Sequence, residues 1–363
     1  MTDFIRISAP SRSDSSANSI GVLRYLLAVL IVLHHMNGLM GLNIPLLLRA
    51  DTVVYAFFAL SGFFAWKSYS HTPYAWTFIR HRLLRLLPPY WAVVILSAVG
   101  FSAVSVYSVS EYFTSVGFWK YLGANSLLLN FLAPELPGVF TDHLLTVVNG
   151  SLWYVKLEVA FTFVVPLFDW SVRVFRRLLQ PFLERTSSEV CVWCQRALPW
   201  GVWLAISMAL FAVRFFFPEG GDLLFRYLCD FVMFLSGLMM SYAGLKGDRR
   251  CALGKICFLG MFFLGIFVGW RDDLTSPFLY YLFSTAVIWI LIVLFLSTGV
   301  GAVFNRNNMT YSVYLCHFPL IQLSLCWTTD PVVAGLISVL LIGLCAPLLY
   351  HGLERRSQLV IYY

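Results

Sequence analysis

Long apolar runs recur along most of this chain, and each is about as long as a helix that crosses a bilayer. The runs are continuously apolar and do not alternate with a period of two, which favours helices over a membrane β-barrel. They lie at residues 20–40, 52–70, 89–109, 147–169, 199–217, 223–243, 253–271, 278–297, 308–327 and 331–352. The pattern predicts an all-α, polytopic membrane bundle of about ten transmembrane helices.

The composition supports this prediction. The 363 residues are 60% hydrophobic and 12% charged, with a mean hydropathy of +0.78, unlike a soluble globular domain. The first run is too long for the apolar part of a signal peptide and has no small-residue cleavage site after it. We expect a disordered cytosolic leader at residues 1–18, a membrane domain at 19–355 and a short cytosolic tail at 356–363.

The net charge of +7 would suit a nucleic acid, but the positions of the cations indicate a membrane topology instead. With the N-terminus in the cytosol, the cytosolic loops collect most of the lysines and arginines. The opposite side receives only Arg49, Lys120 and Arg271. We therefore expect both termini in the cytosol, the lipid bilayer as a partner, and no nucleic acid.

The eight cysteines give only a weak metal signal. The Cys191 and Cys194 pair falls in an expected cytosolic loop, has no histidine pair at ligand spacing nearby, and lies where disulfides are disfavoured. Cys251 and Cys257 follow in the next such loop. We expect no metal site.

Two ionisable side chains share one face of the first run. Arg24 and His35 are eleven residues apart, and eleven steps of roughly 100° return a helix to nearly the same face, about 16 Å further along. Ionisable groups at membrane depth are costly and indicate function by default. His34 lies about 80° off this face and is interpreted as a packing neighbour. The alternative is that both histidines only mark a helix end.

Three arginines, Arg80, Arg82 and Arg85, precede the third run. Their planar forks suit phosphate oxygens, while anchoring to anionic lipid headgroups is the alternative. Pro88 and Pro89 follow, and we expect them to break or start a helix and so fix the arginines as a platform.

The fourth and ninth runs carry further polar groups. Ser151, Tyr154 and Glu158 share one helical face, so the carboxylate is expected to orient an imidazole or to pair with a buried arginine; a structural ion pair is the alternative. His317 stands shortly before Pro319, which should kink its helix.

A series of motifs with matching order and spacing resembles the acyltransferase 3 family of integral membrane acyltransferases. The matching residues are Arg24 and His35; the segment 57–63 (FFALSGF); Arg80, Arg82, Arg85, Pro88 and Tyr90; Ser151, Leu152, Trp153, Glu158 and Pro166; Tyr311, Ser312, Tyr314 and His317; and Glu354 with Arg355.

The resemblance implies an O-acyltransferase that moves an acyl group, expected to be acetyl, from cytosolic acyl-coenzyme A to a hydroxyl of a surface glycan, polysaccharide or lipopolysaccharide unit in a bacterial inner membrane. The catalytic residues it implies are His35 as general base or acyl carrier, Glu158 as the group that orients His35 or balances its charge, and Arg24. The donor-binding residues it implies are Arg80, Arg82, Arg85 and Tyr90. The supporting residues it implies are Ser61, Ser151, Trp153, Tyr314 and His317.

Acyl-coenzyme A is then a donor substrate and no cofactor is permanently bound. The family often has an acidic residue where this chain has Tyr55, with Asp51 one turn earlier. The soluble esterase-like domain of some members is not expected after residue 363. Two other readings stay open: a transporter or flippase for a glycan or lipid-linked substrate, and a non-catalytic partner in a glycan-synthesis complex. The lack of obvious inverted repeats opposes the first.

Overall fold

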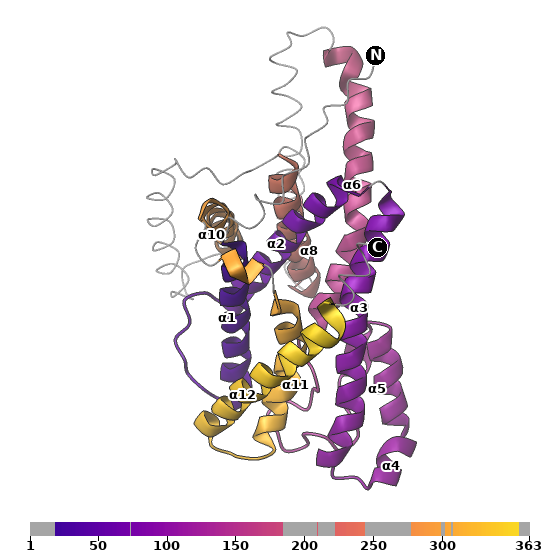
Figure 1. The fold of residues 1–363 in the computed structure, drawn as a ribbon, viewed down its shortest axis with the longest axis vertical. Coiled ribbons are helices and arrows are strands. Elements are labelled where there is room, and N and C mark those ends of the chain that lie inside the picture. The colour runs from indigo at the N-terminus through magenta and orange to yellow at the C-terminus, as the bar shows by residue number, and fades with distance from the viewer. Residues whose placement is uncertain are drawn as a thin grey trace.

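The computed structural model describes residues 19–72, 74–183, 209, 222–243, 277–298, 302–305 and 308–355. Every regular element in these ranges is helical, which confirms the all-α membrane fold (Figure 1). The principal helices are α1 (Ile20–Met40), α2 (Ala50–Ser70), α3 (Ala75–Gly100), α6 (Trp153–Leu183), α8 (Asp222–Tyr242), α10 (Pro277–Ser297), α11 (Thr310–Leu325) and α12 (Pro331–Leu349). Short 3₁₀ segments are η1 (Phe101–Val104), η2 (Asn130–Leu132) and η3 (Ala302–Asn305), and the π-helical η4 (Tyr350–Glu354) extends α12.

Each predicted run within the described residues overlaps a helix, and the first run matches α1 at both ends. The run predicted at 89–109 began too late, because α3 already starts at Ala75. Three described helices are long and apolar enough to cross a membrane: α1, α3 with η1, and α12 with η4. The predicted runs at 199–217 and 253–271 lie outside the described residues. So do the predicted leader and tail and the cysteines at 191, 194, 251 and 257.

Helices α2 and α8 are in close contact because each has a glycine at the crossing. A Cβ atom on Gly62 would lie 1.9 Å from the carbonyl oxygen of Phe234, and one on Gly237 would lie 1.7 Å from that of Ala59. Small residues permit such backbone contact between membrane helices. The glycine of the FFALSGF segment therefore holds α8 against α2, and the preceding Ser61 turns toward α6.

The N-terminal end of α1 is held by segments far away in the chain. The backbone N–H of Gly21 donates to Oδ1 of Asn305 at 2.6 Å, and that of Ser19 donates to the carbonyl of Phe295 at 2.8 Å. These contacts satisfy donors that a helix start leaves unpaired. They bring η3 and the end of α10 beside the turn that carries Arg24.

Helix α3 differs from the prediction at its prolines, because it runs through Pro88 and Pro89 without interruption. Proline is tolerated inside membrane helices where neighbouring groups satisfy the backbone. The two prolines leave the carbonyls of Leu84 and Arg85 without an N–H partner in the helix. Next to them, the hydroxyl of Tyr311 on α11 donates to the carbonyl of Leu86, 2.7 Å away, and joins α11 to this turn of α3. The arginines are consequently side chains of α3 itself, and helical phase decides which way they point.

Two short helices, α4 (Val109–Thr114) and α5 (Val116–Ser126), were not predicted. They follow α3 and pack beside its C-terminal half (Figure 1). Ser108 and Glu111 form a capping box at the start of α4, a signal that is visible in the sequence.

Candidate active site

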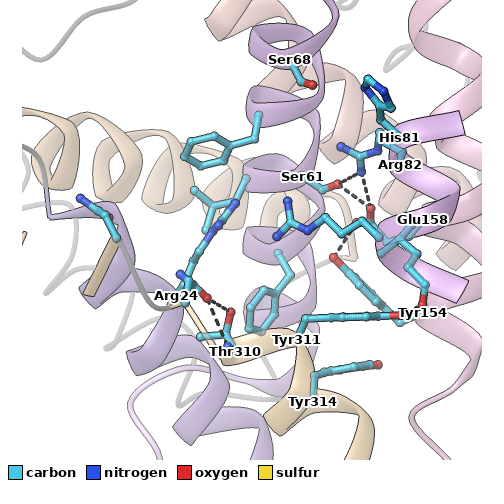
Figure 2. A pocket seen from close by; sticks show the side chains of 17 residues that line it. Arg24, Ser61, Ser68, His81, Arg82, Tyr154, Glu158, Thr310, Tyr311 and Tyr314 are labelled. Carbon is cyan, nitrogen blue, oxygen red and sulfur yellow. Dashed lines mark hydrogen bonds and ion pairs between the residues drawn. The ribbon is translucent and has the colours of Figure 1, made fainter. Parts of the chain in front are cut away.

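A pocket of about 370 Å³ lies where α1, α2, α3, α6 and α11 meet (Figure 2). Arg24, Arg82 and Arg85 line it together with a single carboxylate, Glu158. Aromatic side chains form much of the remaining wall: Phe57, Phe64, Tyr154, Tyr311 and Tyr314. A cavity with three guanidinium groups and one carboxylate carries a surplus of positive charge.

The ion pair between Arg82 and Glu158 is the centre of the polar network. Nη2 of Arg82 lies 2.9 Å from Oε2 of Glu158, and both side chains are largely buried. Ser61 donates to the same carboxylate oxygen at 2.5 Å and accepts from Nη2 at 3.0 Å (Figure 2). This network joins α2, α3 and α6.

Residues of α6 complete the network. The hydroxyl of Tyr154 donates to Oε1 of Glu158 at 2.6 Å, and Thr162 accepts from Nε of Arg82 at 3.2 Å. Both carboxylate oxygens and two nitrogens of the guanidinium therefore have partners. Burial of an ion pair is tolerated when the remaining donors and acceptors are satisfied in this way.

The expectation that Glu158 orients His35 is not met by this geometry. The carboxylate of Glu158 forms its ion pair with Arg82 on α3, and the hydrogen-bond partner of His35 is His317. Helical phase had placed Glu158 on an inward face, but it does not identify which of several neighbouring helices supplies the partner. Of the two pairings open to Glu158 in the sequence, the structure has the one with a buried arginine.

Arg24 and Arg85 give the pocket its unbalanced charge. In the described part of the chain neither forms an ion pair, although the buried carboxylate of Glu354 in η4 interacts electrostatically with both from a longer distance. The guanidinium of Arg24 instead lies over the ring of Phe64, 4.3 Å from its centroid. Stacking on an aromatic ring leaves the edge of the guanidinium and its N–H groups able to bind an anion.

Two of the expected donor-binding residues lie outside the pocket. Arg80 is exposed, because it is two residues from Arg82 and so points to another face of α3, whereas Arg85 is three residues away and shares the inner face. Tyr90 is fully buried, and its hydroxyl donates to the carbonyl of Asn125 at 2.7 Å. Tyr90 therefore fastens α5 to α3, and we correct its assignment to the donor site.

His35 on α1 and His317 on α11 form a direct pair, with 2.8 Å between Nδ1 of His35 and Nε2 of His317. Nδ1 of His317 faces the carbonyls of Tyr314 and Val313 at 2.7 and 3.3 Å. A carbonyl only accepts, so this nitrogen carries the hydrogen. With both rings neutral, Nε2 of His317 accepts from Nδ1–H of His35. Nε2 of His35 is then the unprotonated nitrogen, the form a general base needs.

The neighbouring histidine takes no part in this pair. Nε2 of His34 donates to the carbonyl of Leu48 at 2.7 Å, which ties α1 to the segment before α2. His34 and His35 therefore lie on different faces of α1 and have different partners.

The histidine pair does not line the arginine pocket but lies behind its wall. Tyr314 lines the pocket, and its ring centroid is 5.7 Å from that of His317. The hydroxyl of Tyr314 donates to the carbonyl of Ser151 at 2.6 Å, which fixes the ring. Tyr314 is consequently the side chain shared by the two parts of the candidate site.

The proline in α11 is accommodated by a side chain that sequence reasoning did not single out. Pro319 has no N–H for the carbonyl of Leu315, and Nδ2 of Asn149 donates to that carbonyl at 2.9 Å. Oδ1 of Asn149 accepts from the hydroxyl of Ser151 at 2.6 Å. α11 therefore stays one helix through the proline, and the start of α6 is joined to the turn that carries His317.

The other expected site residues have structural contacts. The ring of Trp153 packs near Phe58 and beneath the guanidinium of Arg226, 4.8 Å from its centroid. Asp51 is the acid nearest to Tyr55, the position where the family often has an acidic residue. Its carboxylate lies 4.0 Å from the guanidinium of Arg226, and it does not line the pocket.

Several polar residues of the pocket were missed. His81 lines it beside Arg82, and Asn305, Asn308 and Thr310 line it from the segment before and at the start of α11. The last three lie in a short 3₁₀ segment, a loop or a helix end, where no periodic pattern marks the inner face, whereas His81 lies within α3 and was expected in a loop. Among the described residues, no three His, Cys, Asp or Glu side chains are close enough together to hold a metal ion.

Comparison with known families identifies the chain. The model of an acyltransferase domain, the acyltransferase 3 domain, matches residues 18–351, which include every residue of the pocket and the histidine pair. Searches of curated proteins and of solved structures gave no match. Because the match covers nearly the whole chain, this helical membrane protein belongs to the acyltransferase 3 family.

Proposed function

We propose that the protein is an O-acyltransferase that moves an acyl group, in the first instance acetyl, from cytosolic acyl-coenzyme A to a hydroxyl of a surface glycan. The observation that carries the proposal is the pairing of an arginine pocket with a neutral histidine pair behind its wall. The first suits an anionic donor and the second suits activation of a hydroxyl. The expected setting is a bacterial inner membrane with both termini in the cytosol.

The donor would bind by its phosphates to Arg24 and Arg85. These guanidinium groups face the same cavity and form no ion pair in the described structure, so a bound anion would add charge-assisted contacts that neither has now. Arg82 has a different role in this proposal, because Glu158 already occupies it. Its ion pair holds α3 against α6 and so keeps Arg85, one turn along α3, at the pocket.

His35 would act on the acceptor. Nε2 takes the proton from the acceptor hydroxyl while the hydroxyl oxygen bonds to the acyl carbon and the bond from that carbon to the sulfur of coenzyme A breaks. The departing thiolate takes the proton from His35. His317 acts as a positioning residue, because its acceptor nitrogen holds the hydrogen of His35 on Nδ1. An acyl-histidine intermediate, with Nε2 attacking the acyl carbon first, uses the same ring and the same tautomer.

The acyl group would pass Tyr314 to reach His35. Arg24 and His35 lie about 16 Å apart along α1, so the donor needs a long arm between its phosphates and its thioester. Coenzyme A has such an arm. The acceptor would approach His35 from the end of α1 opposite to Arg24.

Donor binding tests this proposal, and α3 provides a matched control. We expect Arg85→Ala to weaken acetyl-coenzyme A binding to the purified protein by about 1.5–3 kcal/mol, the value of one charge-assisted contact. Arg80→Ala removes the same charge from an exposed position outside the pocket and should leave the affinity unchanged. Calorimetric titration in detergent gives both values. Equal losses in the two variants would point to general electrostatic attraction, and no loss in either would contradict the assignment.

A further inference from the structure

A second cluster of reactive side chains lies at the far end of α11. Cys326 caps that helix and is exposed, and its Sγ atom is 3.8 Å from Nε2 of His143. Nδ1 of His143 is 3.0 Å from Oε1 of Gln322. Cys326 is sixteen residues from Thr310, which lines the arginine pocket, so the two sites are about 24 Å apart along α11.

The orientation of Gln322 fixes the protonation of His143. Gln322 is fully buried, and its amide nitrogen donates to the carbonyls of Leu145 and Val147 at 2.7 and 2.9 Å. Its Oε1 atom therefore faces His143 as an acceptor, and the hydrogen of the neutral imidazole lies on Nδ1. Nε2 of His143 is then unprotonated, and the thiol hydrogen of Cys326 has two acceptors at 3.8 Å, this nitrogen and the carbonyl of Gln322. Of the two, only the imidazole nitrogen can take the proton away as the thiol reacts.

The imidazole is also held in place by its own loop. The ring of His143 stacks on that of Phe140, with centroids 4.9 Å apart and planes 15° apart. Phe140 adopts a φ of 57°, in the left-handed region that a bulky residue rarely occupies. Such strained backbone persists only where its surroundings require it. Here it places the aromatic ring under the imidazole.

We infer that Cys326, His143 and Gln322 form a second nucleophilic site, in which the thiol accepts an acyl group from a thioester. A nucleophile, a base within reach and a third group that orients the base are the arrangement of covalent acyl transfer. The thioester that meets Cys326 is not the donor bound at the arginines, because that pocket lies about 24 Å away at the other end of α11; it is a second acyl thioester that arrives on the acceptor side. The choice of a thioester as the electrophile rests on the proposed function, whereas the reaction of the thiol through His143 does not.

The step is balanced within this cluster and its substrate. The thiol proton of Cys326 passes to Nε2 of His143 as Sγ bonds to the carbonyl carbon of the thioester. The bond from that carbon to the sulfur of the departing thiol breaks, and the departing sulfur takes the proton from His143. The product is an acyl thioester on Cys326.

The test measures modification at Cys326 in the purified full-length protein by mass spectrometry of its peptides. One probe is iodoacetamide, which reports thiol activation alone, and the other is S-acetyl-N-acetylcysteamine, a small acetyl thioester. We expect both to react with Cys326 in the native chain and about tenfold or more slowly in His143→Ala. Imidazole added to His143→Ala should restore part of the rate. Cys345 is the internal reference, because it is half-buried on α12 and has no hydrogen bond to a histidine in the described part of the chain.

Two outcomes would overturn the inference. Equal iodoacetamide rates at Cys326 in the native chain and His143→Ala would mean an exposed thiol only. Activation of the thiol without acetylation by the thioester would remove its acyl-accepting role. Repeating both reactions in His35→Ala separates this inference from the proposed function, because that variant should lose transfer to the glycan while Cys326 reacts as before.

Discussion

At the scale of single residues, the side chains of the candidate site are determined by their hydrogen-bond partners more than by their position in a motif. Nε2 of His35 is unprotonated because Nδ1–H of His35 donates to Nε2 of His317. The hydrogen of His317 lies on Nδ1, which faces the carbonyl of Tyr314. Glu158 owes its charge balance to Arg82. The sequence identified all four residues, but it could not assign these pairs because they join helices that are distant in the chain.

The same limit explains Tyr90 and Arg80. Both belong to a motif with Arg85, and the sequence offered no reason to separate them. Tyr90 is excluded from the donor site because it is buried against α5. Arg80 is excluded by its helical phase, which is defined because α3 continues through its prolines. A helix that started at the prolines would have left the phase of the arginines undefined.

The ion pair of Arg82 and Glu158 leads to a prediction about stability. We expect Glu158→Gln to destabilise the protein by about 3–5 kcal/mol, because it leaves a buried guanidinium without its counter-charge. The double variant Arg82→Gln with Glu158→Gln should recover part of that loss, since it removes both charges. Thermal unfolding in detergent measures each variant. Additive losses in the double variant would show that the two side chains do not act as a pair.

At the scale of elements, most helices were predictable because hydrophobic length alone specifies a membrane span. α1 begins and ends where the apolar run does. The helices that escaped prediction, α4 and α5, are too short to give an apolar run of that length. The contact of α2 with α8 also escaped, because a glycine in a sequence does not reveal which helix it touches.

The glycine at that crossing supports a prediction of its own. Gly62→Ala should cost about 1–3 kcal/mol of stability or more, because its new methyl group would overlap the backbone of α8. Gly38→Ala in α1 is the control, since a Cβ atom there meets nothing within 4 Å. Detergent-extracted yield and thermal unfolding compare the two. Equal behaviour of both variants would contradict the close packing of α2 on α8.

At the scale of the whole molecule, the arrangement has a direction. The arginine pocket lies at the starts of α1 and α11, whereas the histidine pair lies deeper along both helices and Cys326 lies at the far end of α11. A donor bound at the arginines and an acceptor beyond the histidines would therefore approach from opposite sides. The excess of lysine and arginine in alternate loops predicts that the arginine end faces the cytosol.

Cysteine labelling in intact cells tests that assignment. Tyr74→Cys, just before α3, should react with a membrane-impermeant maleimide only after lysis, and Val116→Cys, at the start of α5, should react without lysis. Both positions are exposed, so access to the reagent differs only by side of the membrane. The background replaces Cys326, which is exposed, and the four cysteines at 191, 194, 251 and 257 by serine, so that these native thiols do not react in their place. The opposite labelling pattern would reverse the topology and place the arginine pocket outside the cytosol.

The most direct measurement is the rate of acetyl transfer by purified variants at the two adjacent histidines of α1. We predict that His35→Ala lowers the rate by about 10²- to 10⁴-fold, the usual contribution of a positioned base, and by more if the ring carries the acyl group. It should leave acetyl-coenzyme A affinity intact, because His35 lies outside the arginine pocket. His34→Ala should retain most activity, since His34 only contacts the carbonyl of Leu48. Full activity of His35→Ala, or loss of activity in His34→Ala alone, would contradict the assignment of the chemistry to the pair of His35 and His317.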